Sequence, residues 1–264
     1  DDIISSRTTN VADALSGKVA GLSVSSTSAD PGSVSNVVIR GFSSINGSNQ
    51  PLYVVDGVPL QNNMVSGSGK NVSTGGISSV ASEDIASMTV LKGAAATALY
   101  GSRAANGVIV ITTKSGKKGD GRNFSISYSG NVQSRVVSYL PELQNSFGQG
   151  WNGAQTFIEN GSWGPRLDGS MQVYGPIWNN QQLIHEYSAK KNNLKDFFDP
   201  GWSQNHTISL SGVSNDSKMD YYLSYSYTND DGIMPDDYDT YERNTVAFRG
   251  GYQATDWLKA VSYT

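Results

Sequence analysis

From residue 123 onward, apolar and polar side chains alternate along the chain with a period of two. In the segment 124–133, Phe124, Ile126 and Tyr128 lie on one side, and the residues between them are serines. The segments 206–213, 219–228, 243–252 and 257–264 repeat this pattern. Such alternation is typical of a β-strand with one apolar face. The second half therefore predicts five amphipathic strands, whose opposite faces are rich in Ser and Thr.

The connections between these strands alternate in length. The segment 134–205 is very long, 214–218 is tight, 229–242 is long and acidic, and 253–256 is tight. A transmembrane β-barrel has long loops on the outside and short turns on the other side, and strands of about 9–11 residues cross a bilayer at a tilt. We therefore expect antiparallel barrel strands with an apolar face toward lipid. A soluble β-sandwich is the alternative, although its inward face must be apolar.

Five strands cannot close a barrel, and unpaired strand edges are costly in lipid. The chain is therefore expected to be the front part of a longer one. The residues expected to face lipid are Phe124, Ile126, Tyr128, Leu223, Tyr225 and Val246, and those expected to face inward are Ser125, Ser127, Ser224 and Ser226.

The first half, up to residue 121, shows a mixed pattern that predicts a small α+β domain. Asn10 is a candidate N-cap for a helix that ends near Gly21, and a second helix is expected at Ala94–Tyr100. Strands are expected at 22–25, 36–40, 52–55, 88–91 and 108–113. Asp56 and Gly57, between apolar runs, predict a type I′ hairpin turn, and Pro59 places the second arm at a sheet edge.

Composition narrows the class of protein. The 264 residues include no Cys and two His, which excludes disulfides, thiolate sites and a His-rich metal site. A net charge of −4 and a pI near 5.1 argue against a nucleic-acid binder. No apolar run reaches the length of a membrane helix, and the mean hydropathy is −0.37. We expect no cofactor.

Three segments of the first half, taken in order, resemble the plug domain of TonB-dependent outer-membrane transporters. They are Val-Ile-Arg-Gly at 38–41 followed by 52–59, the segment 85–93, and 98–114 with its Leu-Tyr-Gly-Ser-Arg-Ala-Ala-Asn-Gly. The segments 12–21, 44–53 and 174–178 resemble the SusC/RagA sub-family. Gly93 departs from that sub-family, which often has an acidic residue there.

The resemblance implies a plug domain at 1–121 with an incomplete N-terminus. It also implies the first part of a transmembrane β-barrel at 122–264, with 134–205 as a long extracellular loop. In the full family member, a 22-stranded barrel with a plugged lumen lies in the outer membrane of a Gram-negative bacterium. A SusD-like lipoprotein helps hold the substrate, and TonB pulls on a segment N-terminal to this chain. The cargo is most often an oligosaccharide and sometimes a peptide, and the protein is not an enzyme.

The candidate substrate site lies on two plug loops, 42–51 and 61–79. Both are rich in Asn, Ser and Gly, and Lys70 is their one charged residue. Neutral amides and hydroxyls suit a polyhydroxyl ligand, whereas a siderophore or an anionic cargo would call for Arg or Lys. The predicted contacts are Phe42, Asn46, Asn49 and Gln50, with Trp151 or Trp178 from the long loop. Alternatively, these loop residues only form turns, and the aromatic residues pack within their own loop.

Several charged or glycine-rich features could be taken for functional sites, but a structural interpretation is favoured for each. Arg40 and Arg103 are expected to be buried and paired with barrel carboxylates, and His206 is expected to open a strand at the barrel rim. The acidic residues of 229–242 lack the spacing of a calcium loop, and Gly-Ser-Gly-Lys at 67–70 lacks the rest of a phosphate loop.

A nutrient importer explains these patterns best. A surface carbohydrate-binding module and a secreted hydrolase are the alternatives. The hydrolase would need a nucleophile beside a histidine, and no nucleophile elbow accompanies His185 or His206.

Overall fold

The computed structural model describes residues 11–26, 31–33, 35–60, 77, 80–116, 123–156, 158 and 160–263. Contacts divide the chain into two compact units. Unit 1 comprises Asp1–Arg135, Gly201–Gly232 and Asp236–Thr264, and unit 2 comprises Val136–Pro200 and Ile233–Pro235. Among the residues that the structure describes, no helix is both long and apolar enough to span a membrane.

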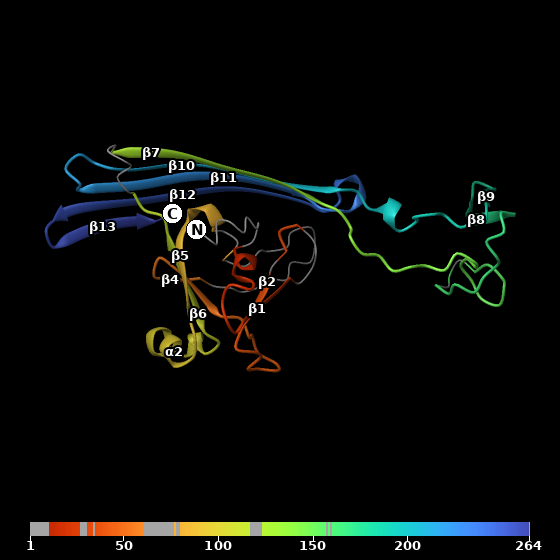
Figure 1. The fold of residues 1–264 in the computed structure, drawn as a ribbon, viewed down its shortest axis with the longest axis horizontal. Helices are drawn as coiled ribbons and strands as arrows, with labels where there is room; N and C mark the ends of the chain where they lie inside the picture. Colours follow the sequence, from red (N-terminus) through yellow and green to blue (C-terminus); the bar gives the residue numbers. More distant parts are fainter. Residues whose placement is uncertain are drawn as a thin grey trace. The chain divides into compact units, whose positions relative to one another are not determined.

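The first half of unit 1 contains a four-stranded sheet in the order β4-β3-β6-β5 (Figure 1). Its strands are β3 (Leu52–Val55), β4 (Val58–Pro59), β5 (Ile85–Leu91) and β6 (Val108–Thr113). β3 and β6 are parallel, and the other pairs are antiparallel. The prediction of a buried strand at 108–113 is confirmed, because β6 is central and Val108, Ile109 and Ile111 are fully buried.

The remaining elements of this half are short. β1 (Leu22–Ser26) and β2 (Ser35–Ile39) form an antiparallel pair. The helices are α2 (Ala94–Tyr100) and the 3-10 turns η1 (Asp13–Leu15), η3 (Ser82–Asp84) and η4 (Gly101–Ala104). The helix predicted at Ala94–Tyr100 is confirmed with its bounds.

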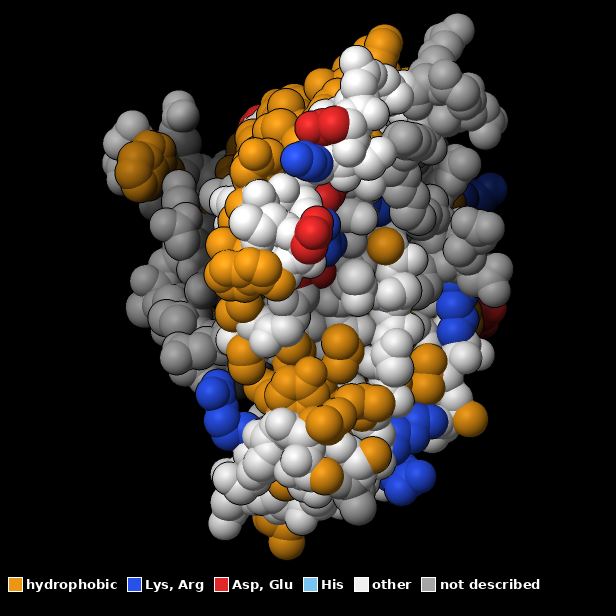
Figure 2. Space-filling view, turned by 90° about the vertical axis from the view of Figure 1, so that its left-hand side faces the viewer, with side chains coloured by type: hydrophobic (Ala, Val, Ile, Leu, Met, Phe, Trp, Pro, Cys, Tyr) orange, Lys and Arg blue, Asp and Glu red, His pale blue; other side chains and the backbone are white. Residues whose placement is uncertain are grey.

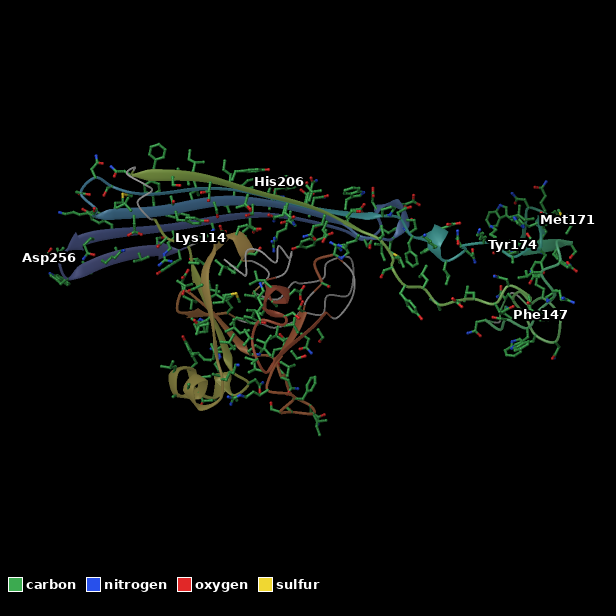
Figure 3. All side chains as sticks on the ribbon, viewed as in Figure 1. Lys114, Phe147, Met171, Tyr174, His206 and Asp256 are labelled. Carbon is green, nitrogen blue, oxygen red and sulfur yellow. The ribbon has the colours of Figure 1, made fainter. Side chains whose placement is uncertain are left out.

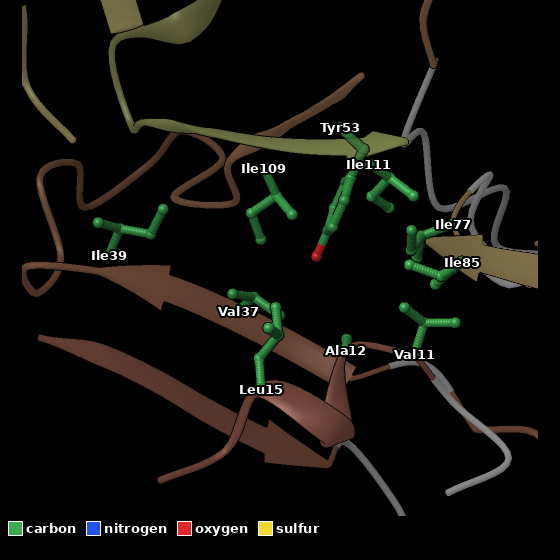
Figure 4. Close-up of a cluster of buried hydrophobic side chains, with 10 residues drawn as sticks. All are labelled: Val11, Ala12, Leu15, Val37, Ile39, Tyr53, Ile77, Ile85, Ile109 and Ile111. Carbon is green, nitrogen blue, oxygen red and sulfur yellow. The ribbon is translucent and has the colours of Figure 1, made fainter. Parts of the chain in front are cut away.

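The core of this half joins η1, β2 and the four-stranded sheet (Figure 4). Tyr53 projects from β3 among the isoleucines of β6 and is 1% exposed. Burial away from water raises the pKa of the Tyr53 hydroxyl well above its ordinary value. The members of this cluster are Val11, Ala12, Leu15, Val37, Ile39, Tyr53, Ile77, Ile85, Ile109 and Ile111.

The longer helix predicted before Gly21 is wrong, because only η1 forms there. Ser16 leaves helical geometry with φ −59° and ψ 129°, and Gly17 follows with φ 72°. The apolar stripe is nevertheless buried, since Val11, Ala14 and Leu15 are at most 3% exposed. The proposed N-cap, Asn10, lies outside the described residues.

The Asp56–Gly57 turn is confirmed. Asp56 has φ 47° and Gly57 has φ 87°, which are the two positive values that a type I′ turn requires. The second arm, β4, has two residues and lies at the sheet edge, as Pro59 predicts.

The second half of unit 1 is a five-stranded antiparallel sheet in the order β13-β12-β11-β10-β7 (Figure 1). The strands are β7 (Phe124–Arg135), β10 (Gly201–Val213), β11 (Met219–Asp231), β12 (Thr240–Thr255) and β13 (Leu258–Tyr263). All five predicted strands are present. The acidic connection shortens to 232–239, because β11 and β12 extend into it. β10 begins five residues earlier than predicted, so His206 lies within a strand and does not open one (Figure 3).

The two faces of this sheet have opposite polarity. On β11, Leu223 and Tyr225 are 42% and 44% exposed, whereas Ser224 and Ser226 are 2% and 1% exposed. The apolar face is the exposed one, and exposed hydrophobic side chains form a broad part of the surface in Figure 2. Exposed members of the apolar face include Phe124, Ile126, Tyr128, Ile208, Leu223, Tyr225, Val246 and Phe248.

Unit 2 is built around a hairpin of β8 (Met171–Trp178) and β9 (Gln181–Glu186). Asn179 and Asn180, both with positive φ, form its turn. The residue pattern of 134–205 did not predict this hairpin. The turns η5 (Lys195–Phe197) and η6 (Pro235–Asp237) complete the helical elements among the described residues.

Candidate functional site

The predicted loop 42–51 is organised around the side chain of Asn49. Its Oδ1 accepts hydrogen bonds from the backbone N–H groups of Ser43 and Ser44, each at 2.8 Å, and its Nδ2 donates to the Ser44 carbonyl at 2.7 Å. The amide of Asn49 is therefore occupied by the loop itself. This geometry is that of a turn-forming residue.

Asn106 fixes this loop to the turn before β6. Its Nδ2 donates to the Ser48 carbonyl at 2.7 Å, and its Oδ1 accepts from the Ser43 hydroxyl at 2.7 Å. This role of Asn106 was not predicted from the sequence. No local signal could have found it, because the two bonds join residues 58 and 63 positions apart.

The loop surface presents Phe42, Ile45 and Asn46. Phe42 is 76% exposed, Ile45 is fully exposed, and Asn46 is exposed. Gln50 is half-buried. Of the four predicted loop contacts, Phe42 and Asn46 are exposed, Gln50 is half-buried, and Asn49 is bonded within the loop.

The second predicted loop, 61–79, falls almost entirely outside the described residues. Ile77 is described and belongs to the hydrophobic core, with 4% of its surface exposed.

The predicted aromatic contacts Trp151 and Trp178 belong to unit 2, whereas the loop 42–51 belongs to unit 1. Trp178, at the end of β8, is 77% exposed, and Trp151 is 47% exposed. A Cβ atom on Gly161 would lie 2.4 Å from the Trp151 ring, so the chain passes close over that ring. Trp163 lies 6.3 Å from Phe147 in a tilted pair. Trp151 and Trp163 therefore contact their own unit, while the ring of Trp178 is open to solvent.

The prediction that Arg40 and Arg103 are buried is wrong, because both side chains are exposed. Arg40 follows β2 with φ 59°. None of the ion pairs found among the described residues includes either arginine. Among the described residues, the ion pair between the plug and the barrel strands has the opposite arrangement, with the arginine, Arg249, on β12 and the carboxylate, Asp56, on the plug.

A buried hydrogen bond joins the four-stranded sheet to the five-stranded sheet. The Tyr222 hydroxyl on β11 donates to Asp84 Oδ1 at 2.8 Å, and the two residues are 4% and 3% exposed. Asp84 ends η3, and its carbonyl accepts from the Lys114 N–H at 2.7 Å.

A second contact lies at the end of β6. Arg249 Nη1 donates to the Thr113 carbonyl at 2.9 Å and lies 3.5 Å from Asp56 Oδ1. Asp56 also accepts from the Thr113 N–H at 3.0 Å and from the Thr113 hydroxyl. Tyr222 and Arg249 are register partners on adjacent strands. We call Asp56, Asp84, Tyr222 and Arg249 the latch.

The acidic residues of 229–242 are divided between β11, β12 and the connection between them. Asp230 is buried on β11 and pairs with Arg135 of β7, while Glu242 lies on β12. Across the described part of the chain, no group of three or more His, Cys, Asp or Glu side chains is arranged to hold a metal ion. The hydroxyl-rich face of the five-stranded sheet carries pairs of hydrogen-bonded hydroxyl groups, such as Thr207 with Ser226 at 2.7 Å.

Comparison with known proteins is consistent with this architecture. The family model of the TonB-dependent receptor plug domain matches residues 1–108. The chain is 36% identical over 234 residues to TonB-dependent receptor SusC of Bacteroides thetaiotaomicron, covering 89% of this chain and 20% of that relative. It is 32% identical over 238 residues to TonB-dependent receptor P26 of Formosa agariphila, covering 89% and 21%.

Among solved structures, the RagAB peptide transporter superimposes with a TM-score of 0.68 at 27% identity, covering 97% of this chain and 28% of that one. The chain thus spans about a fifth of the length of the curated relatives it matches.

Proposed function

The chain belongs to the TonB-dependent receptors of the SusC/RagA type, and we propose that it serves the active import of an oligosaccharide across the outer membrane. It carries a plug domain followed by strands of a β-barrel. Proteins of this family are outer-membrane transporters of Gram-negative bacteria and are not enzymes.

The observation that carries this proposal is the polarity of the five-stranded sheet. Its apolar face is exposed, and its hydroxyl-rich face is buried on the central strand β11, as Leu223 and Ser224 show. A soluble sandwich buries its apolar face, whereas a barrel strand in lipid turns that face outward. This polarity supports transport over the soluble carbohydrate-binding module.

The proposed organisation places the plug at 1–121 and barrel strands from 122. The expected surface loop 134–205 narrows to 136–200, because β7 and β10 extend into it. The boundary falls at residues 121 and 122, where the structure describes nothing. The proposed partners are a SusD-like surface lipoprotein, the TonB protein and outer-membrane lipid. The relation to SusC and to RagAB supports the first two.

The proposed cargo contacts on the plug loop 42–51 are Phe42 and Asn46. Trp178 of unit 2, whose ring is exposed, is proposed separately as a stacking surface for a sugar ring. The loop has no charged residue, which suits a neutral polyhydroxyl ligand. Gln50 is a further proposed contact, whereas Asn49 and Trp151 are occupied within their own units. A peptide is the second candidate cargo, because the structurally similar RagAB is described as a peptide transporter.

Uptake of fluorescent oligosaccharides and peptides by cells, with and without a functional TonB, tests this proposal. We expect TonB-dependent uptake of an oligosaccharide, reduced about tenfold or more by Phe42→Ala combined with Asn46→Ala. Leu99→Ala, which removes another exposed apolar side chain of the plug, is the matched control. Uptake of peptides but not of oligosaccharides would contradict the proposed oligosaccharide cargo. Uptake in cells without a functional TonB would contradict the proposed TonB-dependent transport.

A further inference from the structure

Unit 2 contains a cavity of about 930 Å³ that is open to solvent on one side. Its walls come from the segment 140–149, from the β8–β9 hairpin and from the segment 188–195. Figure 3 labels two lining residues, Phe147 in the first segment and Tyr174 on β8. This volume lies within the range of small-ligand sites, which is roughly 300–1,000 Å³.

One part of the cavity wall is aliphatic and aromatic. Leu143 is 55% exposed, Val173 is 46% exposed and Tyr174 is 56% exposed, so these apolar side chains present surface that a ligand could cover. The larger apolar lining residues are Leu140, Leu143, Phe147, Leu167, Val173, Tyr174, Tyr187 and Leu194. Aliphatic side chains outnumber aromatic rings here, and this favours aliphatic groups in the ligand over sugar rings.

The rest of the wall is rich in amides. The side chain of Gln144 is engaged by its own segment, since its Nε2 donates to the Phe147 carbonyl and its Oε1 accepts from the backbone of Ser146. Asn145, Asn160 and Asn192 also line the cavity. Amides both donate and accept, as a peptide backbone does.

Basic residues of the segment 136–200 are concentrated at this cavity, whereas most acidic residues of the same segment lie outside its lining. Lys190, Lys191 and Lys195 line it, and they are three of the four Lys and Arg residues in 136–200. All three are exposed, and none takes part in the ion pairs found among the described residues. Of the five carboxylates in 136–200 that the structure describes, only Glu186 is among the lining residues.

We propose that this cavity binds an acidic peptide segment that also carries aliphatic side chains. The lysines would pair with its carboxylates, the amides would bond to its backbone, and the leucines and Val173 would cover its apolar groups. The site shares no residue with the proposed cargo loop 42–51, which is neutral. It is therefore a second site with a different ligand, and it does not depend on which cargo is imported.

Binding of a labelled peptide to the purified protein in detergent tests the site. The probe is a hexapeptide of Leu and Glu, capped at both ends so that side-chain carboxylates are its only charges. We expect the acidic probe to bind about tenfold or more tightly than the same peptide with Gln in place of Glu, and we expect its affinity to fall with added salt.

Charge reversal identifies the cavity. The triple variant Lys190→Glu, Lys191→Glu and Lys195→Glu should lower the affinity for the acidic peptide by about tenfold or more, whereas Lys218→Glu, in the 214–218 turn of unit 1, should leave it unchanged. Since the three lysines are exposed, the variant should fold, and the triple Lys→Gln variant provides a milder second test.

Equal affinity for the acidic and neutral peptides, or full affinity in the triple variant, would overturn the proposal. Tighter binding of an oligogalacturonate, an acidic glycan used as a competing probe, would overturn the peptide class. Oligosaccharide uptake is measured separately, so failure of the cargo proposal remains distinguishable.

Discussion

At the level of single residues, substitution of Asn49 tests whether its side chain stabilises the loop 42–51 or contacts the cargo. Asn49→Ala removes the acceptor for the Ser43 and Ser44 N–H groups, which are 2.8 Å from it. Each such bond contributes about 0.5–1.5 kcal/mol. We therefore expect amide hydrogen exchange at Ser43 and Ser44 to accelerate by about tenfold.

Asn49→Asp serves as the control, because it keeps the oxygen acceptor and loses only the donor to the Ser44 carbonyl. It should preserve most of the protection at Ser43. Unchanged exchange in Asn49→Ala would show that the loop is held by other contacts, and Asn49 would return to the candidate cargo residues.

Substitutions at two neighbouring residues of β7 test which side chains face lipid. Ile126 belongs to the exposed apolar face, and Ser127 belongs to the hydroxyl-rich face. An Arg near the bilayer midplane of a barrel costs about 2–4 kcal/mol, so Ile126→Arg should lower the free energy of unfolding in lipid vesicles by that amount. Ser127→Arg should cost much less, because Ser127 is exposed on the polar face. Equal costs would contradict the assignment of the two faces.

At the scale of elements, the Asp56–Gly57 turn shows a local signal that fixes a structure. Gly57 has φ 87°, and a side chain in left-handed geometry costs about 1–2 kcal/mol. Gly57→Val should therefore destabilise the plug by at least that amount in chemical denaturation. Gly57→Asn should cost less, because Asn tolerates positive φ. A neutral effect of Gly57→Val would mean that the hairpin does not depend on this turn.

The elements predicted correctly are those with a strong local pattern. α2 and the strands β3 and β6 follow from runs of helix-forming or β-branched residues, and the barrel strands follow from their period of two. The helix expected before Gly21 failed although the spacing of Val11, Ala14, Leu15 and Val19 is helical, because Ser16 leaves helical geometry and Gly17 and Gly21 both adopt positive φ. The start of β10 was predicted five residues too late, because 201–205 shows no alternation of apolar and polar residues. In the structure, this segment nevertheless continues the hydrogen-bonded ladder with β7 and β11.

The site could be predicted only in part. The segment 42–51 is readable from its composition, but the roles within it depend on contacts with Asn106, which no local pattern reveals. Tyr222 was missed for the same reason, since its partner Asp84 lies 138 residues away. The one sequence signal for Tyr222 was that it is an aromatic residue on an otherwise polar, hydroxyl-rich strand face.

At the scale of the whole molecule, the latch links the plug to the barrel strands. Tyr222→Phe removes the donor to Asp84, whose side chain is buried, and a lost hydrogen bond to a charged group costs about 1.5–3 kcal/mol. We expect faster hydrogen exchange at the Lys114 amide, which is bonded to the Asp84 carbonyl.

The control for the latch is Tyr225→Phe, on the same strand. Its hydroxyl donates to Asn244 at 2.6 Å on the exposed face. Exchange at Lys114 should remain as in the unmodified protein. Equal effects of the two variants would show that Tyr222 does not hold the plug.

The central claim is that the exposed apolar face lies against lipid and the hydroxyl-rich face points inward. Because the chain has no cysteine, single cysteines at Ile126, Ser127, Tyr128 and Ser129 can each carry one fluorophore. The most direct measurement is quenching of these fluorophores by brominated lipids. We expect strong quenching at 126 and 128 and weak quenching at 127 and 129, following the period of two. Equal quenching at all four positions, the reverse pattern, or no quenching at any of them would contradict the central claim.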